Sequence, residues 1–564
     1  MPTNNCPICS GSAQNYLFAL DGALAQRCAG CGLVGVANDA RPSSMSHRTD
    51  WAGYETEADA GEQYARMIIG LKERGSVLLI CDEPHPLGKS LRAADCEVVY
   101  CKPADLTAQQ GTFGSVVFLF SLERIENPAI ALDVAHRLLV EGGVLFIATP
   151  AVDSVYSRRL GKSWIHWRNK HPWYFSRPTL QLLLERQGFR YLWFESDRRQ
   201  FGLEHLAQRL QELNMHSALR AVRIVTTLLP SAVTSQQMRM RTSGLLVTAL
   251  KVPRRTGTKL SIIMPVFNER ATVATTLNAV LAKQVEGIDE REIVVVESNS
   301  RDGTREIVKS FEGRPGLKII YEDQPRGKGH AVRTGFHHAT GDIILIQDAD
   351  TEYDINDYDE LLKPLLQWEQ LFVLGSRHSG SFKMRKFTDQ PALALLMNFG
   401  QVLFTWLMNT LYRQKMTDPF TMYKVFRREC LFGLHFECNR FDFDHELVIK
   451  LLLKGYTPFD VPVNYASRSY AEGKKVTIIG DPLLWIRANF RFRFTSPFIT
   501  SKNAYAAARN ALQKARFASR YNARNLPDKL NFAPEAPQPA LNFQPDAVPS
   551  NIAQATAETG ERSQ

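Results

Sequence analysis

Short apolar runs alternate with longer amphipathic stretches through most of the chain. The runs in the first half are SVLLIC, CEVVYC, SVVFLF and GVLFIATP, and those in the second half are LSIIMPV, REIVVVES, LKIIYE and GDIILIQDAD. Apolar strands that alternate with helices are typical of parallel sheets with helices on their faces. The pattern predicts two doubly wound α/β domains, at 41–252 and 260–496, joined by a basic, turn-rich linker at 253–259.

This alternation is absent at both ends of the chain. Residues 1–38 form a short Cys-rich unit, and residues 497–526 form a basic extension. Residues 527–564 consist mainly of Ala, Pro, Gln and Asn without periodicity. Such a composition buries too little apolar surface to offset the entropy of ordering, so we expect a disordered C-terminal tail.

One uncharged stretch, residues 391–412, reaches the length needed to cross a bilayer. Polar residues such as Asn398, Gln401 and Asn409 interrupt it, and basic residues lie on both sides. These features favour a helix that lies in the membrane interface. A buried core helix is the main alternative, and a spanning helix is the third.

Composition adds a basic balance to this picture. The 564 residues are 44% hydrophobic and 22% charged, with a formal net charge of +10. That charge suits a nucleic acid, an acidic membrane surface or phosphorylated substrates. The first residues are polar and lead directly into cysteines. We therefore expect a cytoplasmic protein that is peripheral at the inner face of the cytoplasmic membrane.

Four of the nine cysteines form two Cys-x-x-Cys pairs, Cys6 with Cys9 and Cys28 with Cys31. Two such pairs can hold one tetrahedral Zn²⁺ in a closed structural site, and the metal would supply much of the folding energy of so small a unit. The spacing predicts a zinc ribbon. Unligated or redox-active cysteines are the alternative.

The first α/β domain resembles class I SAM-dependent methyltransferases that carry an N-terminal zinc ribbon. Residues 127–150 (NPAIALDVAHRLLVEGGVLFIATP) and 171–189 (HPWYFSRPTLQLLLERQGF) carry the resemblance. It implies a Rossmann-like methyltransferase fold, which residues 245–252 would close with a last strand.

The cofactor end of this domain departs from the family pattern. Two prolines, Pro84 and Pro86, occupy a turn where glycines are expected, and they remove backbone donors. Tyr100 and Lys102 flank the position where a carboxylate should accept the ribose hydroxyls, and Ser115 replaces a further acidic residue. We expect a degenerate domain with a docking or structural role. An active enzyme that binds SAM is the alternative.

In the second domain, an apolar strand leads to Asp348-Ala349-Asp350. Side chains at i and i+2 of an extended segment share a side, so both carboxylates can reach one hard divalent cation, Mg²⁺ or Mn²⁺. A loop cap is the alternative. Three further motifs lie upstream: Met264-Pro265-Val266-Phe267-Asn268-Glu269, Glu297-Ser298-Asn299-Ser300-Arg301-Asp302-Gly303-Thr304 and Arg326-Gly327-Lys328-Gly329.

With these motifs, residues 260–494 resemble a family 2 glycosyltransferase of GT-A fold, similar to the dolichol-phosphate mannosyltransferase and polyprenyl-phosphate glycosyltransferase group. The resemblance implies a metal site at Asp348, Asp350 and Glu352, and inversion at the anomeric carbon. It implies nucleotide-sugar contacts at Pro265, Asn268, Glu269, Glu297, Asp302, Lys328, Asp348 and Arg377.

The downstream motifs concern the acceptor. Asp444 and Glu446 match the acidic helix start of the family, and either would be the base for a hydroxyl acceptor. Arg377, Arg468 and Lys474 would clamp an anionic acceptor, and a solvated basic loop is the alternative. Asp350, Asp444, Glu446, Arg468 and Lys474 are the predicted catalytic set.

These features predict a metal-dependent hexosyltransferase that moves a sugar from a nucleoside-diphosphate sugar to an acceptor. The uncharged stretch and basic charge favour a polyprenyl phosphate at the membrane surface, in cell-envelope glycan synthesis, over a saccharide. One alternative is a bifunctional enzyme that also methylates a saccharide hydroxyl. Another is a non-enzymatic nucleic-acid-binding scaffold, but basic and acidic residues are interspersed, so we expect no nucleic-acid partner.

Overall fold

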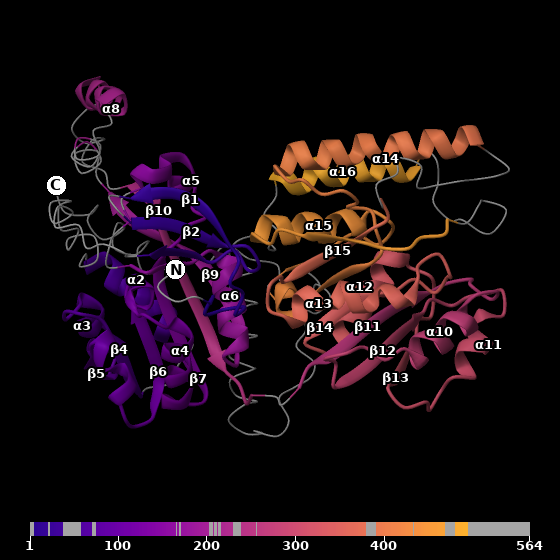
Figure 1. Ribbon diagram of the computed structural model, residues 1–564, viewed down its shortest axis with the longest axis horizontal. Helices are drawn as coiled ribbons and strands as arrows, with labels where there is room; N and C mark the ends of the chain where they lie inside the picture. The colour runs from indigo at the N-terminus through magenta and orange to yellow at the C-terminus, as the bar shows by residue number, and fades with distance from the viewer. Residues whose placement is uncertain are drawn as a thin grey trace, which may run out of the picture.

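The computed structural model describes residues 5–494, except 21–22, 38–57, 70–74, 165, 168–170, 202–206, 208–210, 212–215, 229–237, 255–256, 379–390, 433 and 468–479. The chain forms two α/β units that lie beside each other (Figure 1). The predicted basic extension and C-terminal tail fall outside the described residues. The predicted α/β class with parallel-rich sheets is confirmed in both units.

The N-terminal cysteines belong to a small antiparallel sheet in the order β1-β2-β3-β8. Its first three strands are β1 (Gln14–Leu20), β2 (Ala23–Cys28) and β3 (Val34–Ala37). The fourth, β8 (Trp173–Tyr174), comes from much later in the chain and pairs with Val34 and Gly35. The ribbon of residues 1–38 therefore does not complete its sheet by itself.

The first unit is built on a six-stranded sheet in the order β5-β4-β6-β7-β10-β9. The four apolar runs of the first half form its parallel part, and β10 runs antiparallel to β7 and β9. The strands are β4 (Ser76–Ile80), β5 (Glu97–Cys101), β6 (Phe113–Leu119), β7 (Leu139–Pro150), β9 (Phe189–Phe201) and β10 (Met238–Lys251).

Local capping explains where two of the helices in this unit begin. Asn127 accepts hydrogen bonds from the amides of Ala129 and Ile130, and Pro128 occupies the first helical position of α4. Ser176 and Thr179 form a reciprocal capping box at α6. The helices are α2 (Ala58–Ile69), α3 (Pro86–Ala93), α4 (Pro128–Leu138), α5 (Val155–Leu160), α6 (Arg177–Arg186) and α8 (His216–Leu228).

The second unit is built on a seven-stranded sheet in the order β13-β12-β11-β14-β16-β15-β17. The first four of these strands are parallel, and β16 runs antiparallel between β14 and β15. The strands are β11 (Lys259–Val266), β12 (Glu290–Glu297), β13 (Leu317–Tyr321), β14 (Ile343–Ile346), β15 (Phe372–Ser376), β16 (Lys424–Arg427) and β17 (Phe459–Pro462).

Helices of the second unit cover this sheet, and α14 and α16 lie side by side above α15 (Figure 1). Among the described residues, no helix is both long enough and apolar enough to cross a membrane. The helices are α10 (Val273–Ala282), α11 (Thr304–Lys309), α12 (Lys328–His338), α13 (Tyr358–Leu366), α14 (Pro391–Tyr412), α15 (Phe443–Lys454) and α16 (Gly480–Phe494).

The two units are joined by buried polar contacts. The Arg177 guanidinium donates to the Lys454 carbonyl at 2.6 Å, and the Leu192 amide donates to Oε1 of Glu429 at 2.9 Å. The Gln370 side chain donates to the carbonyl of Gly30, beside the cysteines, at 3.0 Å. One hydrophobic core runs through the ribbon, the first unit and the second unit.

Candidate active site

The predicted site motifs of the second unit lie around the carboxyl ends of its parallel strands. Pro265 lies near the end of β11, and Asp348 and Asp350 follow β14. In open α/β sheets this edge is where ligands bind. A cavity of about 810 Å³ opens here, and Pro265, Glu269, Asp348, Asp350, Glu352, Lys328, Arg377 and Asp444 are among the residues that line it.

Three predicted nucleotide contacts, Asn268, Glu297 and Asp302, are not among the lining residues but hold the turns next to the cavity. Asn268 has φ +50°, and its side-chain oxygen accepts the Arg301 amide at 3.0 Å. Asp302 accepts the Thr304 amide at 3.0 Å, and its pKa is lowered because hydrogen bonds outweigh burial. Glu297 is fully buried and pairs with Arg305 at 3.2 Å. Their carboxylates and amide fix the turns that carry the lining residues Glu269 and Ser298.

Lys328 enters the cavity from the first turn of α12. The preceding Gly327 has φ +103°, and a Cβ there would collide with the backbone oxygen of Asn439, so this turn requires glycine. Nζ of Lys328 lies 2.7 Å from Oδ1 of Asp348. Burial lowers the pKa of Lys328, but the carboxylates of Asp348, Asp444 and Asp350 outweigh burial and hold it above its usual value.

The three predicted metal ligands line one cavity, and each carboxylate has a partner. Asp348 pairs with Lys328, Oδ1 of Asp350 accepts the amide of Glu352 at 3.1 Å, and Oε2 of Glu352 accepts the hydroxyl of Tyr465 at 2.7 Å. Among the described residues, the oxygens of these three carboxylates are not gathered as closely as the four cysteine sulfurs described below. Their donor chemistry still fits a hard cation, since carboxylate oxygens are the ligands that Mg²⁺ and Mn²⁺ take.

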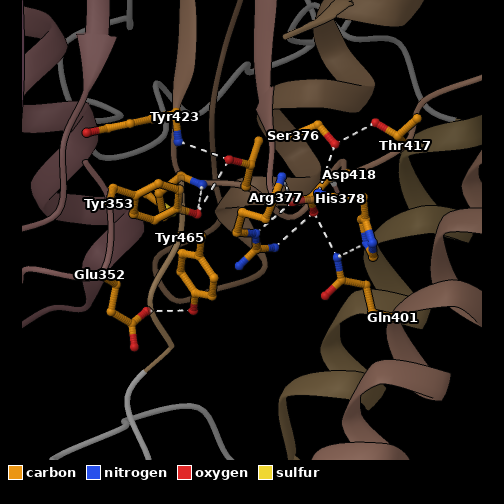
Figure 2. Close-up of polar contacts among 12 residues, drawn as sticks. Glu352, Tyr353, Ser376, Arg377, His378, Gln401, Thr417, Asp418, Tyr423 and Tyr465 are labelled. Atoms are coloured by element: carbon orange, nitrogen blue, oxygen red, sulfur yellow. Dashed lines mark hydrogen bonds and ion pairs between the residues drawn. The ribbon is translucent and has the colours of Figure 1, made fainter. Parts of the chain in front are cut away.

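Arg377 also lines the cavity and is held by Asp418 (Figure 2). Its Nε and Nη2 donate to the Asp418 carboxylate at 2.6 and 2.9 Å, and the ring of Tyr465 lies 5.1 Å below the guanidinium. Burial opposes both charges, but the pair outweighs it: the pKa of Arg377 is raised and that of Asp418 is lowered. Nη1 of Arg377 makes no hydrogen bond with the part of the chain that is described, so it is open to an anion.

Tyr465 and Gln401 line the cavity but are absent from the residues predicted above. Gln401 was visible as a polar residue inside an apolar helix, which is a signal of a buried hydrogen bond. Tyr465 has no comparable signal, because it depends on the bridge between Tyr353 and Tyr465 that brings two distant segments together.

The two predicted base candidates separate in the structure. Asp444 lines the cavity, and one of its carboxylate oxygens lies 3.2 Å from Nζ of the buried Lys424. Glu446 is fully buried; it accepts the amides of Glu437 and Cys438 at 2.9 and 2.8 Å and pairs with Lys450 at 2.6 Å. Only Asp444 of the two faces the cavity. Arg468 and Lys474 lie outside the described residues.

Part of the cavity lining is apolar. It comes from residues of α14, α16 and the segment before β16, namely Met397, Phe404, Phe420, Met422 and Trp485. The outer faces of the same two helices expose large apolar side chains. Trp406 is 62% exposed, and the others are Leu395, Phe399, Leu403, Leu483 and Phe490. The alternative that residues 391–412 form a buried core helix therefore holds for the inner face of α14 and not for its outer face.

The cysteine cluster is a second candidate site. The sulfurs of Cys6, Cys9, Cys28 and Cys31 all lie within 4.8 Å of one another, and the amide of Ile8 points at Sγ of Cys6 from 3.4 Å. Four closely spaced sulfurs that are mostly buried match the donor set of a structural zinc site. This cluster could bind zinc.

Side chains make close contacts at the expected cofactor end of the first unit. The Tyr100 hydroxyl lies against Gly88, where any Cβ would collide with it. Arg124 pairs with Asp82 across the turn after β4, and Nδ1 of His85 accepts the Leu87 amide at 3.0 Å. These contacts occupy the turn that should approach a nucleoside.

Comparison with known proteins finds matches in both units. Residues 261–432 match the family model "Glycosyl transferase family 2", and residues 73–192 match a "Methyltransferase domain". A dolichol-phosphate mannosyltransferase of Pyrococcus furiosus is 26% identical over 218 residues, and a dolichyl-phosphate beta-glucosyltransferase of Trichomonas vaginalis is 26% identical over 217. The matches cover 38% and 36% of this chain but only 59% and 63% of those relatives.

Among solved structures, glucosyl-3-phosphoglycerate synthase from Mycobacterium tuberculosis, in complex with Mn²⁺, UDP and phosphoglyceric acid, is similar at 19% identity and a TM-score of 0.30. The similarity covers 42% of this chain and 79% of that one. By the family models, residues 261–432 are similar to family 2 glycosyltransferases and residues 73–192 are similar to a methyltransferase domain.

Proposed function

We propose that the second unit transfers a sugar from a nucleoside-diphosphate sugar to a polyprenyl phosphate at a membrane surface, in cell-envelope glycan synthesis. The observation that carries the proposal is the lining of the main cavity. It combines the charged side chains of Lys328, Asp348 and Asp350 with the apolar side chains of Phe404, Phe420 and Trp485. A cavity with both charged and apolar lining suits an acceptor with an anionic head and a hydrocarbon chain.

In the proposed reaction, an oxygen of the acceptor attacks the anomeric carbon of the donor. The new carbon–oxygen bond forms as the bond to the diphosphate breaks, and the nucleoside diphosphate leaves. Lys328 holds a positive charge where negative charge grows on the leaving group, and Nη1 of Arg377 is available to the acceptor phosphate.

A phosphate oxygen is already ionised near neutral pH and needs no base. With a hydroxyl acceptor, Asp444 is the base candidate because it faces the cavity and Glu446 does not. Asp348 and Asp350 would hold Mg²⁺ or Mn²⁺, and Glu352 would support them. The cation, when bound, would supply charge neutralisation of the diphosphate.

The outer face of α14 and α16 supports the membrane part of the proposal. Phe399, Leu403 and Trp406 project from α14 with at least half of each side chain exposed. Arg487 and Arg491 are exposed on α16 beside them. Aromatic and aliphatic side chains next to arginines are typical of helices that lie in the interface of an anionic bilayer.

Product analysis tests the transfer reaction. Purified protein is incubated with a panel of nucleotide sugars, with and without polyprenyl phosphate in vesicles, and products are identified by mass spectrometry. We expect a glycosylated polyprenyl phosphate from at least one donor. Transfer only to a soluble saccharide would contradict the lipid-phosphate proposal and leave the glycosyltransferase assignment standing.

Vesicle sedimentation tests the surface separately. Trp406→Glu is expected to release the protein from phosphatidylglycerol-containing vesicles. Val155→Glu is a matched control, since Val155 is also 62% exposed but belongs to α5 of the first unit. Equal binding by the Trp406 variant and wild type would count against α14 as the contact.

For the first unit we propose a docking role without methyl transfer. The close contacts at Gly88 and Asp82 support this role, and so do the hydrogen bonds of Arg177, Leu192 and Gln181 with the second unit. A unit that supplies one side of a polar interface needs its fold and not a cofactor.

A further inference from the structure

Gln401 connects the outer helix α14 to the arginine of the main cavity (Figure 2). Its side-chain amide donates to Oδ1 of Asp418 at 2.9 Å and to Nε2 of His378 at 3.1 Å. Asp418 is fully buried and holds Arg377 through both carboxylate oxygens. A chain of two contacts thus runs from the middle of α14 to the guanidinium.

The hydrogen bond from Gln401 is one of four that hold the Asp418 carboxylate. Oδ2 accepts the amide and Nε of Arg377, while Oδ1 is shared between Nη2 of Arg377 and the amide of Gln401. Loss of one donor leaves a buried carboxylate oxygen underbonded, which favours a rotation or shift of Asp418 toward another donor. Because Arg377 is bound in a fork, any such shift would move Nη1 relative to the cavity.

α14 carries this contact on its inner face and the exposed apolar residues on its outer face. Asn398, Gln401 and Met408 are buried, whereas Phe399, Leu403 and Trp406 are exposed. The helix proposed to contact the membrane is therefore also the helix that holds the Arg377 carboxylate partner in place.

We propose that Gln401 is a positioning residue: through Asp418 it orients Nη1 of Arg377 toward the phosphate of the acceptor. Acceptor binding then requires α14 to pack so that Gln401 reaches Asp418. This inference rests on the proposed function, since it assigns Arg377 to the acceptor phosphate.

Steady-state kinetics of Gln401→Met with polyprenyl phosphate in vesicles test the inference. We expect the acceptor KM to rise about tenfold, the size of effect expected when a buried charged group loses a hydrogen bond. The donor KM, kcat and vesicle binding are expected to stay within about twofold of wild type. Gln401→Asn keeps an amide but is too short to reach Asp418, so the same rise of the acceptor KM is expected. This variant replaces the Met variant in the test if the Met variant does not fold.

Two comparisons separate positioning from a structural effect. In an Arg377→Lys background, Gln401→Met is expected to change the acceptor KM by less than about twofold, because coupled residues are not additive. Asn409→Ala removes hydrogen bonds between α14 and the Met416 backbone but none of those made by the Asp418 carboxylate, and is expected to leave the acceptor KM unchanged.

The outcomes that overturn the inference are distinct. An unchanged acceptor KM in the Gln401 variants overturns it, and so does an equal rise in the Asn409 variant or in the Arg377→Lys background. Absence of any transfer to polyprenyl phosphate by the wild type overturns the proposed function, and this inference with it.

Discussion

Nζ of Lys328 lies 2.7 Å from Oδ1 of Asp348, so a cation and a carboxylate of the main cavity neutralise each other before any donor enters. The pair sits between a helix start that requires glycine and a strand end. It places a positive charge within reach of the diphosphate expected there.

Replacing Lys328 with Met is predicted to lower kcat about 100-fold while the protein stays folded, because charge on the leaving group loses its counter-charge. Initial-rate kinetics and thermal unfolding measure the two effects. The raised pKa keeps the ammonium protonated above its usual range, so Lys328 adds no loss of rate between about pH 7 and 10. Wild-type turnover by the variant would remove Lys328 from the mechanism.

Asp350→Asn is predicted to abolish transfer and to leave the unfolding temperature nearly unchanged. The asparagine oxygen can still accept the Glu352 amide, so the turn is preserved, but the negative charge for a cation is lost. Transfer by the wild type should stop with EDTA and return with Mn²⁺ or Mg²⁺. Asp359→Asn, at an exposed carboxylate of α13, is the control and should retain activity.

Metal analysis of the purified protein is predicted to find about one zinc per chain, as four thiolates hold one tetrahedral ion. Cys28→Ser should remove the zinc and lower the stability of the N-terminal sheet. Cys96→Ser changes a buried cysteine outside the cluster and should keep the metal. A zinc-free wild type with a folded ribbon would contradict the assignment.

Calorimetry with SAM is predicted to show no binding in the micromolar range. Pro84 and Pro86 remove backbone donors from the turn after β4, and Asp82 of that turn is engaged by Arg124. A micromolar dissociation constant would instead support the bifunctional alternative.

Glu429 is predicted to make the unfolding free energy depend on pH. Burial and the nearby Glu185 raise the pKa of Glu429 to about 6, so the folded protein binds this proton more tightly than the unfolded chain. Stability then falls as pH rises from about 4.5 to about 6, by about 2 kcal/mol. Urea unfolding of Glu429→Gln, which can still accept the Leu192 amide, should show a flatter profile over that range. An identical profile would contradict this pKa.

Motifs that are continuous in the chain were predictable to a large extent. The apolar runs form the strands, and Lys328, Asp348 and Asp350 meet in one cavity because each follows a turn or strand end whose local chemistry fixes its direction. Asp444 and Glu446 could not be separated from sequence. They lie two residues apart at the start of one helix, and only packing decides which of them faces the cavity.

Contacts between distant segments were not predictable. Gln401 reaches Asp418 only because α14 folds back over the sheet, and Tyr465 reaches Glu352 across a separation of 113 residues. The docking of the two units was equally unpredictable. Arg177 and Glu429 look like surface charges in the sequence, but Arg177 donates to the Lys454 carbonyl and Glu429 accepts the Leu192 amide, both across the interface between the units.

The late origin of β8 has a consequence for the order of events during synthesis. The cysteines leave the ribosome before Trp173 and Tyr174, which complete their sheet only after most of the first unit has been made. Until then, the edge of β3 that pairs with β8 has no partner strand. Metal capture would be the event that protects it during this interval, which makes zinc supply relevant to the yield of folded protein as well as to its stability.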